Sequence, residues 1–146
     1  MSIWFREPNL EFLNDLNPDT MLDVLGIHFT AFGEDYIEAR MPVDRRTHQP
    51  FGILHGGASV VLAESLGSTG ATLCVDTERY YCVGQEINAN HIRPVRHGDV
   101  LGRAEPVHIG RRSHVWSIRI EDERKRLVCI SRLTLAVLAR DDASTA

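Results

Sequence analysis

The sequence predicts an α+β fold in which one antiparallel sheet wraps around one long helix. Two stretches with the two-residue period of strands precede residues 56–74, and four more follow up to residue 138. Residues 56–74 contain no proline and are apolar or small on every face, which predicts a buried helix. Strands and helices do not alternate, and the later strands are joined by short polar breaks. The strands are therefore expected to form antiparallel hairpins rather than parallel βαβ units.

Length and composition fit one globular domain over residues 1–138. The chain has 146 residues, of which 43% are hydrophobic and 25% charged. Its formal net charge of −4 argues against a nucleic-acid partner, because counterion release needs a concentrated basic surface. No apolar run reaches membrane-spanning length, and residues 1–8 lack the pattern of a signal peptide. Three sparse cysteines without a CxxC pair suit a reducing compartment, so we expect a cytoplasmic protein with no membrane partner.

Two short helices and a hairpin are expected before the long helix. Leucines recur at helical spacing in residues 9–16, and an N-cap and a closing glycine bound residues 21–25. Residues 27–32 and 36–43 read as two strands joined by a polar turn. Residues 44–54 form a polar loop with one proline and one glycine, and we expect the active-site loop there.

After the helix the hydrophobic period changes to two and stays there. The predicted strands are residues 82–92, 99–109, 113–122 and 127–138. Residues 139–146 have no apolar pattern and are expected to form a flexible tail. A sheet curled around one helix leaves an edge strand exposed, and such edges pair with other chains. We therefore expect a homo-oligomer joined edge to edge.

One ionisable residue, Glu64, stands in the middle of the predicted helix. No Lys or Arg occurs between Arg46 and Arg79, so the carboxylate has no cationic partner nearby in the sequence. Ser68 follows four residues later on the same helix face. A buried carboxylate without a partner shifts its pKa or finds hydrogen bonds, which makes Glu64 a candidate for chemistry. From the helix alone, an ion pair with a distant arginine is an equally good interpretation.

The loop before the helix favours the functional interpretation. Gln49 and His55 lie on the turn that leads into the helix, and Gly56 stands at its start. Free backbone N–H groups and the helix dipole favour a negative oxygen at that point. A carboxylate, an amide, an imidazole and an oxyanion site within one short segment suit attack on a carbonyl group.

Other chemistries have little support in the sequence. The seven histidines show no HExxH spacing and no compact set with Cys or carboxylate ligands, so no metal site is expected. The chain also lacks a nucleophile elbow, a Walker loop and a dinucleotide fingerprint. His108, Arg111 and Arg112 share a turn that is able to hold phosphates, although a polar hairpin tip is the simpler interpretation.

Residues 51–65, FGILHGGASVVLAES, resemble the signature of hotdog-fold acyl-CoA thioesterases of the 4-hydroxybenzoyl-CoA thioesterase type. Residues 41–44, 84–93 and 131–134 add to the resemblance, which covers nearly the whole chain. It implies a hotdog fold and hydrolysis of an acyl-CoA thioester, with an aromatic acyl group favoured. It also implies no cofactor, since coenzyme A is part of the substrate, and a dimer or tetramer with active sites shared between subunits.

Three alternatives stay open beside that implication. One is a proofreading thioesterase that acts on an aroyl group held by an acyl carrier protein. Another is a non-catalytic regulator that binds acyl-CoA. A hydratase or dehydratase of the same fold is the third.

The resemblance also implies roles for single residues. Glu64 corresponds to the catalytic carboxylate, either as nucleophile or as general base, and the Gly56 N–H polarises the thioester oxygen. Gln49 holds the carbonyl group or the water, His55 supports the loop, and Ser68 orients the water. The positions implied for coenzyme A binding are Gly84, His91, Ile92, Arg93, Pro94, His108, Ile109, Gly110, Arg111, Arg112 and Ser113. Pro94 and Arg111 depart from the family pattern, in which relatives often carry a small polar residue and a serine.

Overall fold

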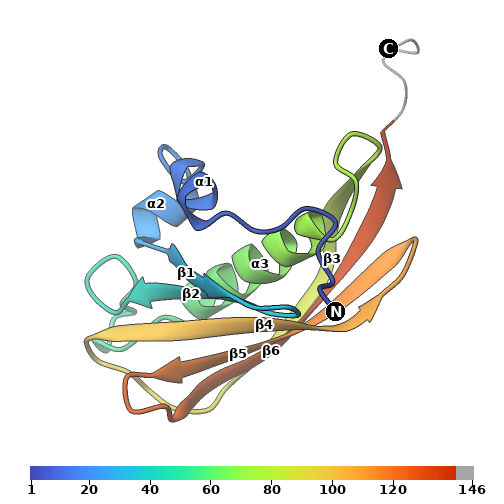
Figure 1. The fold of residues 1–146 in the computed structure, drawn as a ribbon. Coiled ribbons are helices and arrows are strands. Elements are labelled where there is room, and N and C mark those ends of the chain that lie inside the picture. The colour runs from blue at the N-terminus through green and yellow to red at the C-terminus, as the bar shows by residue number, and fades with distance from the viewer. Residues whose placement is uncertain (141–146) are drawn as a thin grey trace.

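A six-stranded antiparallel sheet curves around one long helix, α3, in the computed structural model, which describes residues 1–140 (Figure 1). The strand order is β1-β2-β4-β5-β6-β3, so β1 and β3 are the two edges. The α+β arrangement predicted from the sequence is confirmed. The elements are α1 (Leu10–Asp15), α2 (Met21–Leu25), β1 (His28–Phe32), β2 (Ile37–Pro42), α3 (Gly56–Leu73), β3 (Tyr80–His91), β4 (Asp99–Ile109), β5 (Ser113–Asp122) and β6 (Leu127–Ala139).

The element boundaries agree with the predicted ones to within one residue, except at the start of β3. β3 begins two residues earlier than expected because Tyr80 pairs with Ala139 at the end of β6. Arg140 then donates its backbone N–H to the Arg79 carbonyl at 2.8 Å. Residues 139 and 140 therefore belong to the end of the sheet and not to a tail. The rest of the predicted tail, residues 141–146, lies outside the described residues.

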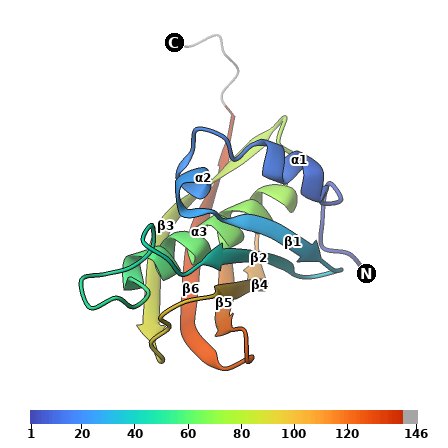
Figure 2. The same ribbon diagram turned by 90° about the vertical axis from the view of Figure 1, so that its left-hand side faces the viewer.

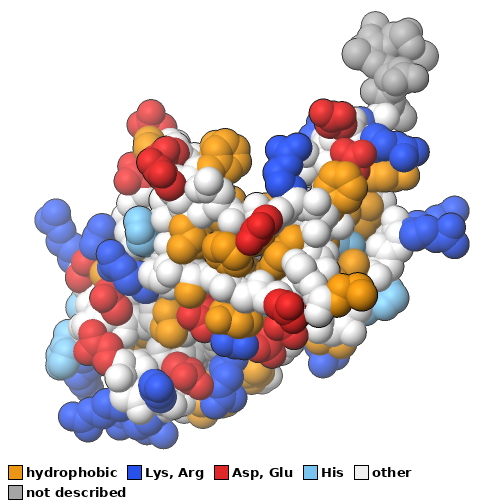
Figure 3. All heavy atoms as spheres, in the orientation of Figure 1, with side chains coloured by type: hydrophobic (Ala, Val, Ile, Leu, Met, Phe, Trp, Pro, Cys, Tyr) orange, Lys and Arg blue, Asp and Glu red, His pale blue; other side chains and the backbone are white. Residues whose placement is uncertain are grey.

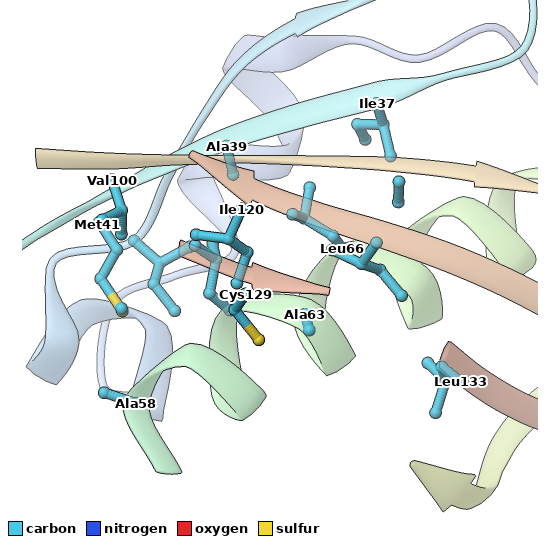
Figure 4. Close-up of a cluster of buried hydrophobic side chains, with 14 of the residues drawn as sticks. Ile37, Ala39, Met41, Ala58, Ala63, Leu66, Val100, Ile120, Cys129 and Leu133 are labelled. Carbon is cyan, nitrogen blue, oxygen red and sulfur yellow. The ribbon is translucent and has the colours of Figure 1, made fainter. Parts of the chain in front are cut away.

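The core lies between the concave side of the sheet and one side of α3 (Figure 4). Leu62, Ala63 and Leu66 of the helix are fully buried. Glycines bring the helix close to the strands: a Cβ at Gly70 would lie 2.8 Å from the Trp116 ring. Any larger residue there would push the helix away from the sheet.

The other side of α3 is only half-buried, which corrects the prediction of burial on every face. Figure 2 shows α1 and α2 close to β1, which is the edge of the sheet opposite to β3 in the strand order. Val60, Val61, Glu64 and Ser68 are of intermediate exposure, whereas the sheet-facing residues are buried. Small apolar residues in a sequence do not reveal whether the sheet of the same chain or a second chain covers them, and here the sheet covers one side only.

The β3 edge is long and largely uncovered within one chain. Tyr81 and Val83 have 38% and 39% of their surface exposed. The strand carries a register shift between Gly84 and Glu86, where it pairs with β6. A long exposed edge strand with apolar side chains is a typical place for pairing with another chain.

Candidate active site

The N-terminus of α3 is built around His55. This residue caps the helix from an extended backbone conformation, and its Nδ1 atom accepts a hydrogen bond from the Gly57 N–H at 2.8 Å. An imidazole that accepts through Nδ1 carries its proton on Nε2 when neutral. Among the described residues, the Gly56 N–H has no acceptor. The start of α3 therefore presents a free N–H group at the positive end of the helix dipole.

Gly56 also makes room for the end of β3. A Cβ at this position would lie 2.7 Å from Nε2 of His91, so the imidazole ring packs directly on the glycine backbone. Any other residue would displace His91 or the first turn of the helix. The sequence places these two residues 35 positions apart, and the fold brings them together.

The loop before the helix holds Gln49 beside this helix start. Its backbone N–H donates to the Ile53 carbonyl at 2.9 Å, and its own carbonyl accepts from Gly52 N–H at 2.9 Å. Gly52 has φ of +74°, a backbone conformation that favours glycine. The Gln49 side-chain oxygen accepts from the Phe51 N–H, which leaves its NH₂ group as a donor.

These residues line one pocket of about 440 Å³ at the start of α3. Six of the residues proposed from the sequence meet there: Gln49, Gly56, His91, Ile92, Arg93 and Pro94. Ile53 and Leu54 of the predicted active-site loop also line the pocket, and Ser59 and Val128, which were not anticipated, complete the walls. Val128 belongs to the pocket because its carbonyl accepts the Ile92 N–H at 2.8 Å, a pairing across strands that the sequence does not reveal.

Glu64 lies outside this pocket, farther along α3. Its carboxylate points to β3, where a Cβ on Gly84 would overlap the Glu64 Oε1 atom. Glu64 is half-buried, and among residues 1–140 it has no ion pair and no side-chain hydrogen bond. Eight residues separate it from Gly56, which is about 12 Å along a helix axis. The free N–H and the carboxylate of one chain therefore do not reach the same carbonyl group.

Ser68 faces a different hollow, between α1 and the second half of α3. This pocket has a volume of about 350 Å³, and Phe12 and Leu16 form its outer wall. Both are unusually exposed for large apolar residues, at 60% and 57%. Ser68 is thus one turn of helix beyond Glu64, at the mouth of an apolar cavity.

The proposed positions 108–113 lie at the opposite end of the sheet. The β4–β5 turn is closed by the Gly110 N–H, which donates to the Ser113 carbonyl at 2.9 Å. Ile109, Gly110 and Arg111 line a third pocket of about 430 Å³, together with residues that follow α3. In Figure 1 this turn is at one end of the sheet, and the loop after β3 is at the other. Within one chain, residues 108–113 and 91–94 are not brought together.

The cysteines are poor nucleophiles in this structure. Cys74, Cys82 and Cys129 are free thiols, half-buried or buried. Burial raises the pKa of Cys74 to about 12, and the neighbouring Cys82 adds to the effect. A thiol with so high a pKa is almost entirely protonated at neutral pH, and a protonated thiol is a weak nucleophile. The carboxylate of Glu64 is therefore the stronger candidate for chemistry.

In residues 1–140, the part of the chain that the structure describes, no group of three or more His, Cys, Asp or Glu residues is placed to hold a metal ion. None of its helices has the length and apolar character needed to cross a bilayer.

Comparison with known proteins finds relatives that cover more than nine tenths of the chain. The sequence profile described as thioesterase superfamily matches residues 51–129. The chain is similar to the 1,4-dihydroxy-2-naphthoyl-CoA hydrolase of Escherichia coli, with 54% identity over 136 residues, 93% of this chain and 99% of the relative. It is 52% identical over 137 residues to the proofreading thioesterase EntH of Cronobacter sakazakii, covering 93% of this chain and 98% of the relative.

A solved structure gives the same result for the fold. The crystal structure of a mutant thioesterase from Pseudomonas aeruginosa superposes with a TM-score of 0.94 and 54% identity. The match covers 95% of this chain and 100% of that one. The hotdog architecture that the resemblance implied is confirmed.

Proposed function

The chain belongs to the thioesterase superfamily and is a thioesterase, and from that premise we propose that its substrate is an aromatic acyl-CoA. The products are the free aromatic acid and coenzyme A. One similar hydrolase, 54% identical to this chain, is named for 1,4-dihydroxy-2-naphthoyl-CoA, which supports a fused or single aromatic ring as the acyl group.

The proposed reaction uses the two groups that the fold leaves free on α3. The thioester oxygen accepts a hydrogen bond from the Gly56 N–H, which stabilises the negative charge that develops when the carbonyl carbon is attacked. Glu64 then acts in one of two ways. It attacks the carbon itself and forms an anhydride that water cleaves, or it removes a proton from the attacking water. In both routes the carbon–sulfur bond breaks, the sulfur leaves as thiolate and takes up a proton.

The observation that carries the proposed reaction is the distance between Gly56 and Glu64 along one helix. At about 12 Å apart they are too distant to serve one carbonyl group within a chain. Two antiparallel copies of α3 remove the difficulty, because the Gly56 of each copy then lies opposite the Glu64 of the other. We therefore propose a homodimer, or a tetramer of two such dimers, with shared active sites.

The β3 edge is the surface that would join the two copies. It is exposed within one chain, and Glu64 lies on the side of α3 that faces it, against Gly84. Pairing β3 with its copy about a two-fold axis would extend the sheet across both chains and bring the two α3 helices side by side in opposite directions. The half-buried side of α3 would then be covered.

The test of the reaction is a thioester panel with wild type and Glu64→Gln. Benzoyl-, hydroxynaphthoyl-, phenylacetyl-, hexanoyl- and palmitoyl-CoA are compared with a benzoyl carrier protein by measuring free thiol. We expect the aromatic CoA esters to be preferred and Glu64→Gln to lose about 10²–10³-fold or more in kcat. A Glu64→Gln variant with wild-type kcat would contradict the proposed role of Glu64, and a preference for palmitoyl-CoA would contradict the proposed acyl group.

The shared site has its own test in mixed oligomers. Glu64→Gln removes the carboxylate, whereas Gly56→Ala keeps the backbone N–H but displaces His91 or the first turn of α3. Once each variant is shown to be inactive alone, the two chains are co-expressed with different tags. If the two residues serve one site from different chains, half of the sites in a mixed dimer regain both groups. Random assembly then restores about one quarter of wild-type activity. If each chain holds its own complete site, no activity returns.

A further inference from the structure

Another pocket, of about 320 Å³, lies beside the pocket at the start of α3 (the helix-start pocket) and is rich in charged side chains; it is called the charged pocket below. It is formed by the loop after β3 and the turn between β5 and β6. In the lower left of Figure 3, Lys and Arg side chains gather where Figure 1 shows the turn between β5 and β6. Its charged lining residues are Arg96, Asp99, Asp122, Glu123, Arg124 and Arg126, and His97 lies among them.

The carboxylates of this pocket are engaged by partners of their own. Asp122 forms an ion pair with Arg126 at 2.7 Å, and its other oxygen accepts the Arg124 and Arg126 backbone N–H groups at 2.9 Å. Glu123 accepts the Asp99 N–H at 3.1 Å, and the Asp99 carboxylate lies 3.8 Å from Arg40. The negative charges are thus tied to the turn itself or to a neighbouring strand.

Two arginines of the same pocket have no carboxylate partner among the described residues. Arg96 and Arg124 are exposed, and neither forms an ion pair with any carboxylate of residues 1–140. Their backbones are fixed, since the Arg96 carbonyl binds His48 Nε2 at 2.8 Å and the Arg124 N–H binds Asp122. Two free guanidinium groups on a fixed frame, in a chain of net charge −4, indicate a site for an anion.

The charged pocket adjoins the helix-start pocket at one end. Pro94 lines both, and Arg96 follows it by two residues. On the opposite wall, Val128 lines the helix-start pocket, and Arg126, two residues before it, lines the charged pocket. Two residues of extended chain span roughly 7 Å, so both walls lead from the free Gly56 N–H past Pro94 to the arginines. An elongated ligand with a carbonyl group at one end and an anion at the other fits this order.

We propose that this charged pocket binds a phosphate of the thiol carrier while the thioester carbonyl lies at Gly56. The inference rests on the proposed function, and it places a phosphate site on Arg96 and Arg124 in addition to the Arg111–Arg112 turn. Coenzyme A and the phosphopantetheine arm of a carrier protein share the necessary chemistry: a thioester, an extended pantetheine arm and a phosphate. Arginine recognises phosphate through paired N–H donors, so both sources are bound in the same way.

The experiment compares thioesters that differ only in their phosphates. Wild type and the double variant Arg96→Gln/Arg124→Gln are assayed with benzoyl-CoA and with benzoyl-pantetheine, which has none. We expect kcat/KM for benzoyl-CoA to fall roughly 10- to 100-fold, mainly through KM. Benzoyl-pantetheine should be hydrolysed equally by both proteins. Lys125→Gln is the control for charge, because it removes one positive charge from the turn that carries Arg124, and Lys125 does not line the pocket.

These measurements test the proposed phosphate site independently of the proposed thioester hydrolysis. An equal loss for both esters, or a loss in Lys125→Gln as large as in the double variant, would overturn the phosphate site. Wild-type hydrolysis of benzoyl-pantetheine would show that the proposed reaction stands even so. Benzoyl-3′-dephospho-CoA and a benzoyl carrier protein identify the phosphate. If the double variant loses activity on both, the pocket holds the phosphate next to pantetheine; if it loses activity on neither, it holds the 3′-phosphate of coenzyme A.

Discussion

The two sides of α3 differ in packing, polarity and tolerance. The side that faces the sheet carries Leu62, Leu66 and Gly70, all buried against strands from one chain. The opposite side carries Glu64 and Ser68, which are half-buried and polar. One helix thus holds the core together on one side and presents functional groups on the other.

This difference explains why a carboxylate is tolerated on a helix that is otherwise apolar. A charge facing the sheet would lose its hydration without a partner, at a cost of several kcal/mol. Glu64 instead lies toward an open edge, where Gly84 leaves it room. Substitutions on the two sides should therefore separate stability from activity.

The largest effect is expected on the sheet-facing side, from Leu66→Ala. Leu66 is fully buried, and its removal leaves a cavity between α3 and the strands. We expect the free energy of unfolding to fall by about 2–5 kcal/mol, measured by urea titration. The activity of the fraction that stays folded should remain close to wild type. A large loss of kcat without a loss of stability would break the distinction between the two sides.

Gly84→Ala should have the opposite signature. The new Cβ would overlap the Glu64 carboxylate, which must move, while the exposed strand has room to adjust. A displacement of about 1 Å in a reacting group costs roughly 10²-fold in rate. Steady-state kinetics should show that loss in kcat, with little change in the urea midpoint. Unchanged kcat would mean that Gly84 does not position Glu64.

Gly102→Ala is the matched substitution on the other side. Gly102 lies on β4, and a Cβ there would approach Leu66 to 2.6 Å and Leu62 to 3.2 Å. Overpacking of this kind typically costs about 1–3 kcal/mol. We expect a lower thermal midpoint with kcat largely retained, measured on the same substrate as for Gly84→Ala. Equal kinetic losses in the two glycine variants would show that the sides of α3 are coupled.

The fold and the position of Glu64 on α3 could be predicted from the sequence, because both have a local signature. Period-two strands mark the sheet, and one carboxylate in an apolar helix marks Glu64. The half-exposed side of α3 was missed, since apolar residues look the same whether a sheet or a second chain covers them. The separation of residues 91–94 from 108–113 depends on strand order, which has no local signature.

The charged pocket was also missed, although a signal for it existed. Arg96 and Arg124 lie in two polar breaks that read separately as solvated turns. β3 pairs antiparallel with β6, so the break after β3 and the break before β6 lie at the same end of the sheet. Knowledge of that one pairing is enough to place the two arginines near each other.

The smallest expected effect is a change in the pH dependence of stability, caused by His114, a buried histidine of β5. His114 is 1% exposed, on the same face of β5 as Trp116, and its Nδ1 atom has no hydrogen-bond partner in residues 1–140. Burial lowers the pKa of His114, and the nearby His108 lowers it further. The folded chain therefore holds this ring neutral at a pH where the unfolded chain, with a pKa near 6.5, already binds a proton.

As the pH falls below about 6.5, proton uptake by the unfolded chain should reduce the free energy of unfolding. Urea titrations between pH 7.5 and pH 5.5 should show a steeper decline in wild type than in His114→Leu, which has no ring to protonate. Identical slopes in the two proteins would mean that His114 takes up its proton as readily in the core as in the unfolded chain.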